Sequence, residues 1–163
     1  MPDTQEIERK FWKSLRSDMT VMLGVSGAHD VTPRPMTAHI DGDADQGPIW
    51  FFTSRDSTLA ESVTREQPAY LNFVAKGHNV WASVSGRLII ANDRAVIDRL
   101  WNSFIEAWSG GGKDNPDLCL LRFDPKDAEI WLDGPSWLTG LKVLFGSDPK
   151  ADHANNVAKV SLA

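Results

Sequence analysis

The segment that decides the fold is GPIWFFTSRDSTLAESV, residues 47–63. Its apolar part, residues 49–54, is rich in aromatic and β-branched side chains, which predicts a strand. The two phenylalanines of this strand point to opposite faces, so at least one of them belongs to the core. A helix is expected over about residues 57–65, because the serine at its start can accept a hydrogen bond from the first turn. The segment is therefore an apolar strand that ends on hydroxyl side chains and leads into a helix without a lysine or arginine in its first turn.

The length and charge of the chain limit the classes of protein to consider. With 163 residues, the chain is long enough for one domain with a substantial core. Seventeen basic and 22 acidic residues give a net charge of -5, which argues against nucleic acid as a partner. Cys119 is the only cysteine, so we expect no disulfide and a reducing compartment, the cytoplasm. The sequence has no run of 18 apolar residues and no signal-type N-terminus, so neither secretion nor a membrane span is expected.

Periodicity and turn residues predict the other elements. Asp3 and Glu6 form a capping pair at the start of a helix over about residues 4–16. The further expected elements are strands at 19–25, 31–40, 68–75 and 79–91, one helix from Asp93 to near Trp108, two strands within 117–133 around a Pro-Lys-Asp turn, and a short helix at 135–146. These six or seven strands with short connections predict a mainly β protein, an antiparallel barrel with peripheral helices. Residues 1–146 are expected to form its single domain, and residues 147–163 a polar C-terminal tail.

Arg34 lies between two prolines in the stretch TPRPMTAHI, residues 32–40. Proline fixes φ and removes a backbone donor, so this stretch is expected at a sheet edge, at a bulge or at the rim of a site. An arginine in that position either caps a turn or serves the site, and the pattern alone leaves both interpretations open.

Motifs of the common enzyme classes are absent from the sequence. It contains no G-x-S-x-G, no P-loop, no H-E-x-x-H and no Rossmann glycine fingerprint, which argues against hydrolases and kinases. The four histidines are scattered, and no pair has the spacing of metal ligands, so no metal is expected.

Four stretches carry a family resemblance: TPRPMTAHI at 32–40, IWFFTSRDS at 49–57, VWASVSGRLII at 80–90, and a segment at 93–133 that runs from DRAVIDRLWNSFIEAW to GGKDNPDLCLLRFDPKDAEIWLD. Together they resemble the pyridoxamine 5'-phosphate oxidase-like flavoproteins, and more narrowly the general stress protein 26 branch. The resemblance covers about residues 6–145. It implies an FMN-binding split β-barrel that forms a homodimer, with one FMN in each of two clefts between the subunits.

The resemblance also implies which residues hold the flavin. Arg34, Met36 and Thr37 are expected along the ring system, and Phe51, Phe52 and Thr53 at the strand end that closes on the flavin and its ribityl chain. Ser57, Thr58 and Leu59 are expected at the phosphate, and Trp81 at the flavin edge. Trp101 and Trp108 belong to the segment that is expected to cross to the other subunit. Some of these residues have a structural alternative: Thr53 and Ser57 fit a strand end and an N-cap, and Trp101 fits a helix core.

The sequence departs from the family pattern where the phosphate would lie. Thr58 and Leu59 stand where members of the broader family commonly carry Arg-Lys or His-Lys, and His39 stands at the basic residue that ends the Arg-Pro-Met strand. Each missing charge-assisted hydrogen bond is worth about 1.5–3 kcal/mol. Arg34 or Arg55 could supply a replacement charge.

The resemblance implies an FMN-dependent oxidoreductase that acts on a small molecule, and the family name suggests a role in the stress response. One alternative is a non-catalytic protein that binds or sequesters flavin. Another is a barrel that uses a different cofactor, such as the deazaflavin F420 or heme, or none. Pyridoxamine 5'-phosphate oxidation is not expected, because the chain ends in HANNVAKVSLA, residues 153–163, without the arginine and histidine cluster of the true oxidases. No catalytic acid or base stands out.

Overall fold

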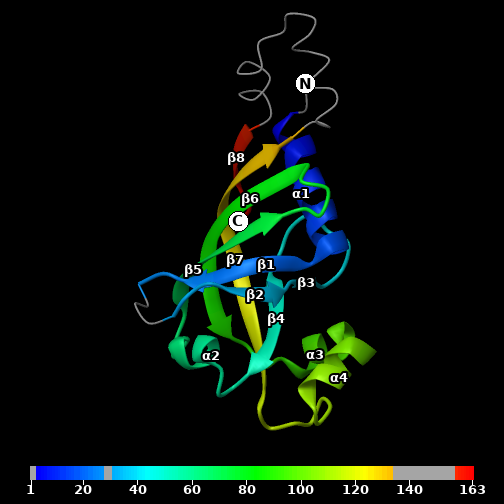
Figure 1. The fold of residues 1–163 in the computed structure, drawn as a ribbon, viewed down its shortest axis with the longest axis vertical. Coiled ribbons are helices and arrows are strands. Elements are labelled where there is room, and N and C mark those ends of the chain that lie inside the picture. Colours follow the sequence, from blue (N-terminus) through cyan, green and yellow to red (C-terminus); the bar gives the residue numbers. More distant parts are fainter. Residues whose placement is uncertain (1–2, 28–30, 134–156) are drawn as a thin grey trace, which may run out of the picture.

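The computed structural model describes residues 3–27, 31–133 and 157–163, so the predicted last helix at 135–146 lies outside the described residues. The protein is mainly β, with a few short helices (Figure 1). The elements in chain order are α1 Thr4–Asp18, β1 Thr20–Val25, β2 Arg34–Thr37, β3 His39–Ile40, β4 Ile49–Ser54, α2 Thr58–Ser62, β5 Gln67–Val74, β6 Val80–Ile90, α3 Arg94–Leu100, α4 Ser103–Ser109, β7 Leu118–Leu132 and β8 Val157–Ser161.

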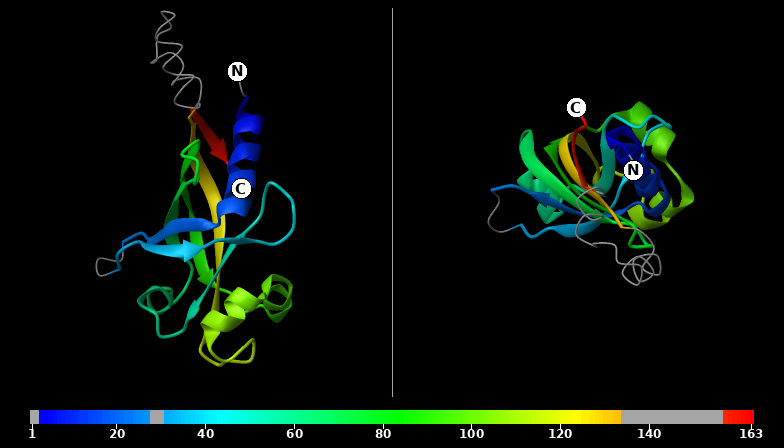
Figure 2. Two further views of the ribbon diagram at one scale, coloured as in Figure 1. Left: turned by 45° about the vertical axis from the view of Figure 1, so that its right-hand side comes forward. Right: turned by 90° about the horizontal axis from the view of Figure 1, so that it is seen from above.

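The strands form one antiparallel sheet that curls into a nearly closed barrel (Figure 2). Their order is β2-β1-β5-β6-β7-β4-β3, and β8 pairs with β7 beside this path. The two ends of the path, β2 and β3, are separated in sequence only by Ala38. One extended segment therefore pairs with β1 through its first half and with β4 through its second, and this switch of partner closes the barrel. The predicted antiparallel barrel with peripheral helices is confirmed.

The N-terminal helix α1 packs into the barrel core. Asp3 is its N-cap, and the carboxylate accepts a 2.7 Å hydrogen bond from the Glu6 N–H, as the sequence predicts. Phe11, Trp12 and Leu15 are fully buried in the cluster that the strands enclose. Burying side chains of this size stabilises the fold by about 1.5–3 kcal/mol each, so α1 is an integral part of the barrel.

Strand β4 is buried on both faces. Phe51 points into the barrel core, whereas Trp50 and Phe52 point outward into a second apolar cluster. Helices α3 and α4 lie beside β4 (Figure 1). Their side chains Ile97 and Ile105 belong to this outer cluster. The nearly continuous apolar run of β4 is therefore explained by a helical layer outside the barrel.

The single helix expected from residue 93 to near residue 108 is wrong, because the structure has two helices. Asn102 has extended backbone angles, and its Oδ1 accepts a 2.9 Å hydrogen bond from the N–H of Ile105. A side chain that caps a new helix ends the old one. The chain turns at this position, so α4 leaves the line of α3.

The two strands expected within residues 117–133 are one continuous strand, β7, which is a second correction. The register between β6 and β7 shifts between Ser85 and Gly86, and Lys126 is the extra residue between the partners Pro125 and Asp127. Proline has no N–H to donate, and a β-bulge tolerates it. The Pro-Lys-Asp sequence thus bends a long strand and does not reverse it.

The expectation of a polar tail at 147–163 is wrong for its last part. Residues Val157–Ser161 form β8, which pairs with β7 from Trp131 to Asp127. Ala158, Val160 and Leu162 are buried in the barrel core. Their alternation with polar residues is the period-two pattern of a half-buried strand.

Candidate functional site

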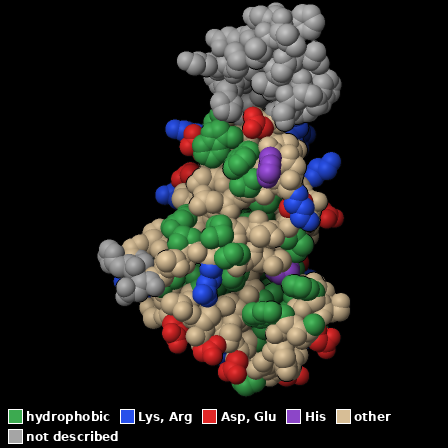
Figure 3. Space-filling model, viewed as in Figure 1, with side chains coloured by type: hydrophobic (Ala, Val, Ile, Leu, Met, Phe, Trp, Pro, Cys, Tyr) green, Lys and Arg blue, Asp and Glu red, His purple; other side chains and the backbone are tan. Residues whose placement is uncertain are grey.

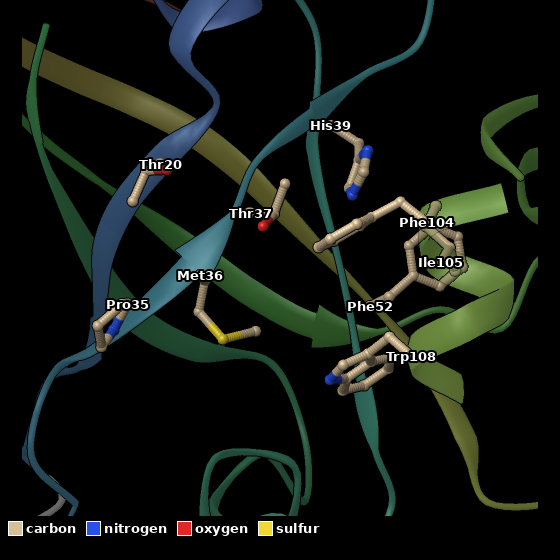
Figure 4. Close-up of a pocket in the computed structure, with 9 residues that line it drawn as sticks. All are labelled: Thr20, Pro35, Met36, Thr37, His39, Phe52, Phe104, Ile105 and Trp108. Carbon is tan, nitrogen blue, oxygen red and sulfur yellow. The ribbon is translucent and has the colours of Figure 1, made fainter. Parts of the chain in front are cut away.

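A pocket of about 240 Å³ lies between the strands around the β2–β3 switch and helix α4 (Figure 4). Four strands contribute one wall and α4 the other. The lining residues are Thr20, Pro35, Met36, Thr37, His39, Phe52, Phe104, Ile105 and Trp108. Most of these side chains are apolar or aromatic, and the polar groups are two hydroxyls and one imidazole. Such a wall suits a flat, largely apolar ligand with a few polar edges.

The strand wall depends on the proline-rich segment. Strand β2 is an end of the sheet path, as the two prolines around Arg34 predict. Pro35 contributes no N–H to a ladder, and its ring lies at the pocket rim beside Met36. Thr37 is the register partner of Thr20 on β1, so the two hydroxyl-bearing side chains lie on the same face.

The helix wall depends on the cap at the start of α4. From this start, Ile105 is buried in the outer apolar cluster and fixes the helix to β4. Phe104 and Trp108 lie one helical turn apart and are 70% and 54% exposed. Aromatic side chains of this exposure at a pocket edge indicate a surface that is completed by a ligand or by another protein.

His39 is the most buried polar residue of the pocket wall, with 7% of its surface exposed. Its ring meets the Phe52 ring edge to face, with a centroid distance of 5.5 Å and an interplanar angle of 81°. Burial lowers the pKa of His39 below its usual value of 6.5, because desolvation disfavours the imidazolium. The imidazole is therefore neutral at pH 7.

The hydroxyls at the end of β4 form a small network outside the pocket wall. Thr53, which is buried, donates a 2.9 Å hydrogen bond to Ser57 Oγ. Ser57 is the N-cap of α2 and accepts a second hydrogen bond of 3.1 Å from the N–H of Ala60. Both lone pairs of Ser57 are then used, and its own proton is left to donate.

The structure brings only some of the sequence-predicted site residues together. Four of them line the pocket: Met36, Thr37, Phe52 and Trp108. Arg34 lies on the same strand as the first two, and Trp101 packs edge to face on Phe52 with a centroid distance of 6.0 Å.

The other predicted residues lie elsewhere. Phe51 and Leu59 are fully buried in the barrel core, so their side chains do not line the pocket. Thr58 is exposed at the start of α2. Trp81 lies at the start of β6, near the β5–β6 turn, where its Nε1 donates a 3.2 Å hydrogen bond to the carbonyl of His78.

The pocket also contains residues that the sequence reasoning did not assign to it: Thr20, Pro35, His39, Phe104 and Ile105. The spacing of Phe104 and Trp108 at i and i+4 was a usable signal, because both fall on one face of a helix. Thr20 offered no such signal, since only the pairing of β1 with β2 brings it to the pocket.

Charge at this end of the molecule is mainly negative. Asp and Glu side chains gather toward the end that carries α2, α3 and α4 (Figure 3). Asp56 lies directly before the N-cap of α2, and Arg55 precedes it. An anionic ligand near α2 therefore meets a carboxylate as well as a guanidinium.

The described part of the chain contains neither a candidate metal cluster nor a candidate membrane-spanning helix. Within residues 3–27, 31–133 and 157–163, no group of three or more His, Cys, Asp or Glu side chains is arranged to hold a metal ion. In the same ranges, no helix combines the length and the apolar character needed to cross a membrane.

Comparison with known proteins identifies related sequences and structures. Residues 6–145 match the family model described as "Pyridoxamine 5'-phosphate oxidase like". General stress protein 26 of Bacillus subtilis (strain 168) is 28% identical over 85 residues, which are 50% of this chain and 60% of that protein. The match thus spans little more than half the length of this curated relative.

Two solved structures share the fold over most of their length. The general stress FMN/FAD binding protein of Xanthomonas citri has a TM-score of 0.76 and 49% sequence identity, and the match covers 81% of this chain and 92% of that one. A Jannaschia sp. CCS1 structure named after general stress protein 26 has a TM-score of 0.82 and 31% identity, covering 98% and 99% of the two chains.

Proposed function

Because the chain belongs to the pyridoxamine 5'-phosphate oxidase-like family, we propose that it binds a flavin, FMN, in the pocket between β2 and α4 and acts as an oxidoreductase on a small molecule. The observation that carries this proposal is the pocket itself, in which aromatic and thioether side chains face two hydroxyls and one neutral imidazole. The Xanthomonas citri protein, at 49% identity, is named for FMN/FAD binding.

The residues of the pocket fit a flavin ring system. Phe104 and Trp108 offer exposed aromatic faces, and Met36 offers a polarisable sulfur on the opposite wall (Figure 4). Thr20 and Thr37 can hydrogen-bond to a polar edge of the ring. When bound, the flavin supplies hydride or electron transfer, and the protein supplies position and polarity.

The phosphate of FMN requires a separate group of donors. Ser57 has a hydroxyl proton to donate, and the Thr53 hydroxyl fixes its orientation. Leu59 stands where the family commonly carries a basic residue, but its side chain is buried in the barrel core, so this position does not present a side chain to the phosphate. Arg34 and Arg55 are therefore the candidate cations. Phosphate binding by Ser57 together with an arginine remains a prediction.

We propose that a second copy of the chain completes the site. A volume of about 240 Å³ lies below the roughly 300–1,000 Å³ of complete small-molecule sites. Pro35 at the pocket rim is the register partner of Met22 on β1, so both side chains lie on the outer face of the sheet. Val74 and Trp81, which are partners on β5 and β6, lie on the same face. Met22, Val74 and Trp81 are each at least 40% exposed, although they are large apolar residues. This apolar face fits a homodimer interface, and across it Trp81 could reach the pocket of the other subunit.

An absorption spectrum of the purified protein, with mass spectrometry of the small molecule released on denaturation, tests the proposal. We expect flavin bands and released FMN. FMN, FAD and riboflavin titrated into flavin-free protein and followed by fluorescence quenching then separate ring binding from phosphate binding. Absence of saturation below about 100 μM FMN, a binding free energy near -5.5 kcal/mol, overturns the proposal.

A non-catalytic flavin-binding protein is the second candidate. The observation that favours it is the scarcity of acid–base groups, because His39 is the single titratable residue among those that line the pocket. Stopped-flow mixing of the flavin-loaded protein with NADH or NADPH separates the two candidates. Reduction of the flavin and reoxidation by an acceptor at steady turnover supports the oxidoreductase, and bound flavin without turnover supports the binding protein.

A further inference from the structure

We infer that His39 is the proton acceptor of this pocket: its neutral imidazole takes up a proton when the bound flavin is reduced and gains negative charge. This inference rests on the proposed function. It assigns a coupling role to a residue that the sequence marks only as a departure from the family pattern.

The first support is the position of His39. Among the nine residues that line the pocket, His39 alone titrates near neutral pH, and it projects from β3 between the strand wall and α4 (Figure 4). It is more than nine-tenths buried, and its ring and the Phe52 ring pack edge to face. A proton on this ring would therefore sit inside the pocket and not in bulk water.

The second support is that no residue in the described part of the chain holds the imidazole by a hydrogen bond or a charge. Burial is the sole cause of its pKa shift, with no hydrogen bond or charge from the described residues contributing. Both ring nitrogens can therefore serve a ligand, one as donor and the other as acceptor.

Four charged groups lie on the elements around His39, and two of them are paired with other side chains. Asp41, two residues along the chain, pairs with Arg99 of α3 at 2.8 Å. Arg122 on β7, in the same register row as Trp50, pairs with Asp124 at 3.0 Å. Glu106 on α4 is exposed. Arg34 lies on β2, next to the pocket residue Pro35. None of these charges contributes to the pKa shift of His39, which is caused by burial.

The sign of the effect follows from these facts. With the uncharged, oxidised ring system of the flavin in the pocket, the lowered pKa keeps His39 neutral at pH 7. A neighbouring negative charge stabilises the imidazolium and raises the pKa. Reduction then takes two electrons from the reductant and two protons from solvent at neutral pH, one proton to the flavin and one to His39. Without His39, two electrons and one proton are taken up.

The test measures the midpoint potential of the bound flavin against pH, between pH 7 and 8, in the wild type and in His39→Asn. Each proton taken up with two electrons contributes about 30 mV per pH unit. We expect a slope of about 60 mV per pH unit in the wild type and about 30 mV in His39→Asn. The matched control is His78→Asn, because His78 is exposed at the β5–β6 turn, outside the pocket; its slope should equal that of the wild type.

A second measurement avoids the variant, in case His39→Asn folds poorly. NMR of histidine-labelled wild-type protein gives the pKa of His39 with oxidised and with reduced flavin. We expect the pKa of His39 to rise on reduction, because a neighbouring negative charge stabilises the imidazolium. Equal slopes in wild type and His39→Asn, or an unchanged His39 pKa, overturn this inference alone. Failure to bind any flavin overturns the proposed function and this inference with it.

Discussion

Thr53 and Ser57 are joined by a hydrogen bond of 2.9 Å between their hydroxyls, and this bond links the end of β4 to the start of α2. Ser57 also caps α2 by accepting from the N–H of Ala60. One serine therefore holds both the strand end and the helix start, and a threonine buried beneath it fixes its rotamer. The polar end of an otherwise apolar strand is thus a structural joint as well as a candidate donor to a ligand.

Replacing either hydroxyl should lower the free energy of unfolding by different amounts. Ser57→Ala removes a cap and leaves the Thr53 hydroxyl without its acceptor, so we expect a loss of about 2 kcal/mol. Thr53→Val removes one donor and keeps the shape, so we expect a loss of about 1 kcal/mol. Urea unfolding measures both values, and Thr64→Val, at an exposed position, is the control with little change. If the hydrogen bond couples the two hydroxyls, the double variant should lose less stability than the sum of the two single losses. A loss equal to that sum would show that the two hydroxyls act independently.

The β6–β7 bulge requires glycine at position 86. A Cβ built on Gly86 would overlap the Asp124 carbonyl and approach the Phe123 ring to 2.8 Å. Because backbone cannot give way as a flexible side chain can, Gly86→Ala should cost about 1–3 kcal/mol or more. Thermal or urea unfolding tests this. The neighbouring Ser85→Ala faces solvent and should change stability by less than about 0.5 kcal/mol; equal effects of the two substitutions would remove the steric explanation.

The sequence predicts the elements that are determined locally. The α1 helix follows from Asp3 and the spacing of its apolar residues, and β4 follows from a run of strand formers. The predicted elements are wrong where one residue type is compatible with two local backbone structures. Asn102 can lie inside a helix or cap a new one, and Pro125 can make a turn or sit in a bulge, and tertiary packing decides between them.

The candidate site is predictable in part for the same reason. Met36 and Thr37 belong to a short motif, and Phe52 belongs to the decisive strand, so the sequence marks them. Their assembly with Thr20 and Phe104 depends on the pairing of β1 with β2 and on the turn before α4. No local pattern in the sequence contains these two relationships.

The exposed aromatic residues of α4 should affect ligand binding more than stability. Phe104 is 70% exposed, so Phe104→Ala removes little buried area and should change the free energy of unfolding by less than about 1 kcal/mol. The flavin affinity should fall by tenfold or more, since an aromatic contact of the pocket wall is lost. Fluorescence titration and urea unfolding of the same variant separate the two effects. Ile90→Ala, also exposed but outside the pocket, is the matched control and should leave the affinity unchanged.

His39 also predicts a pH dependence of stability that does not require a ligand. Its pKa is lowered by burial in the folded state, so the unfolded chain, with a pKa of about 6.5, binds more protons near that pH. Stability contributed by neutral His39 is therefore present above pH 6.5 and is lost as the pH falls from 6.5 toward the lower folded pKa. Urea unfolding of flavin-free protein at several values between pH 5 and 8 measures the loss. His39→Asn should flatten this part of the profile. His78→Asn, at an exposed position of the β5–β6 turn, is the matched control and should reproduce the wild type. A wild-type profile that stays flat between pH 5 and 6.5 would mean that the folded protein accommodates the imidazolium without cost.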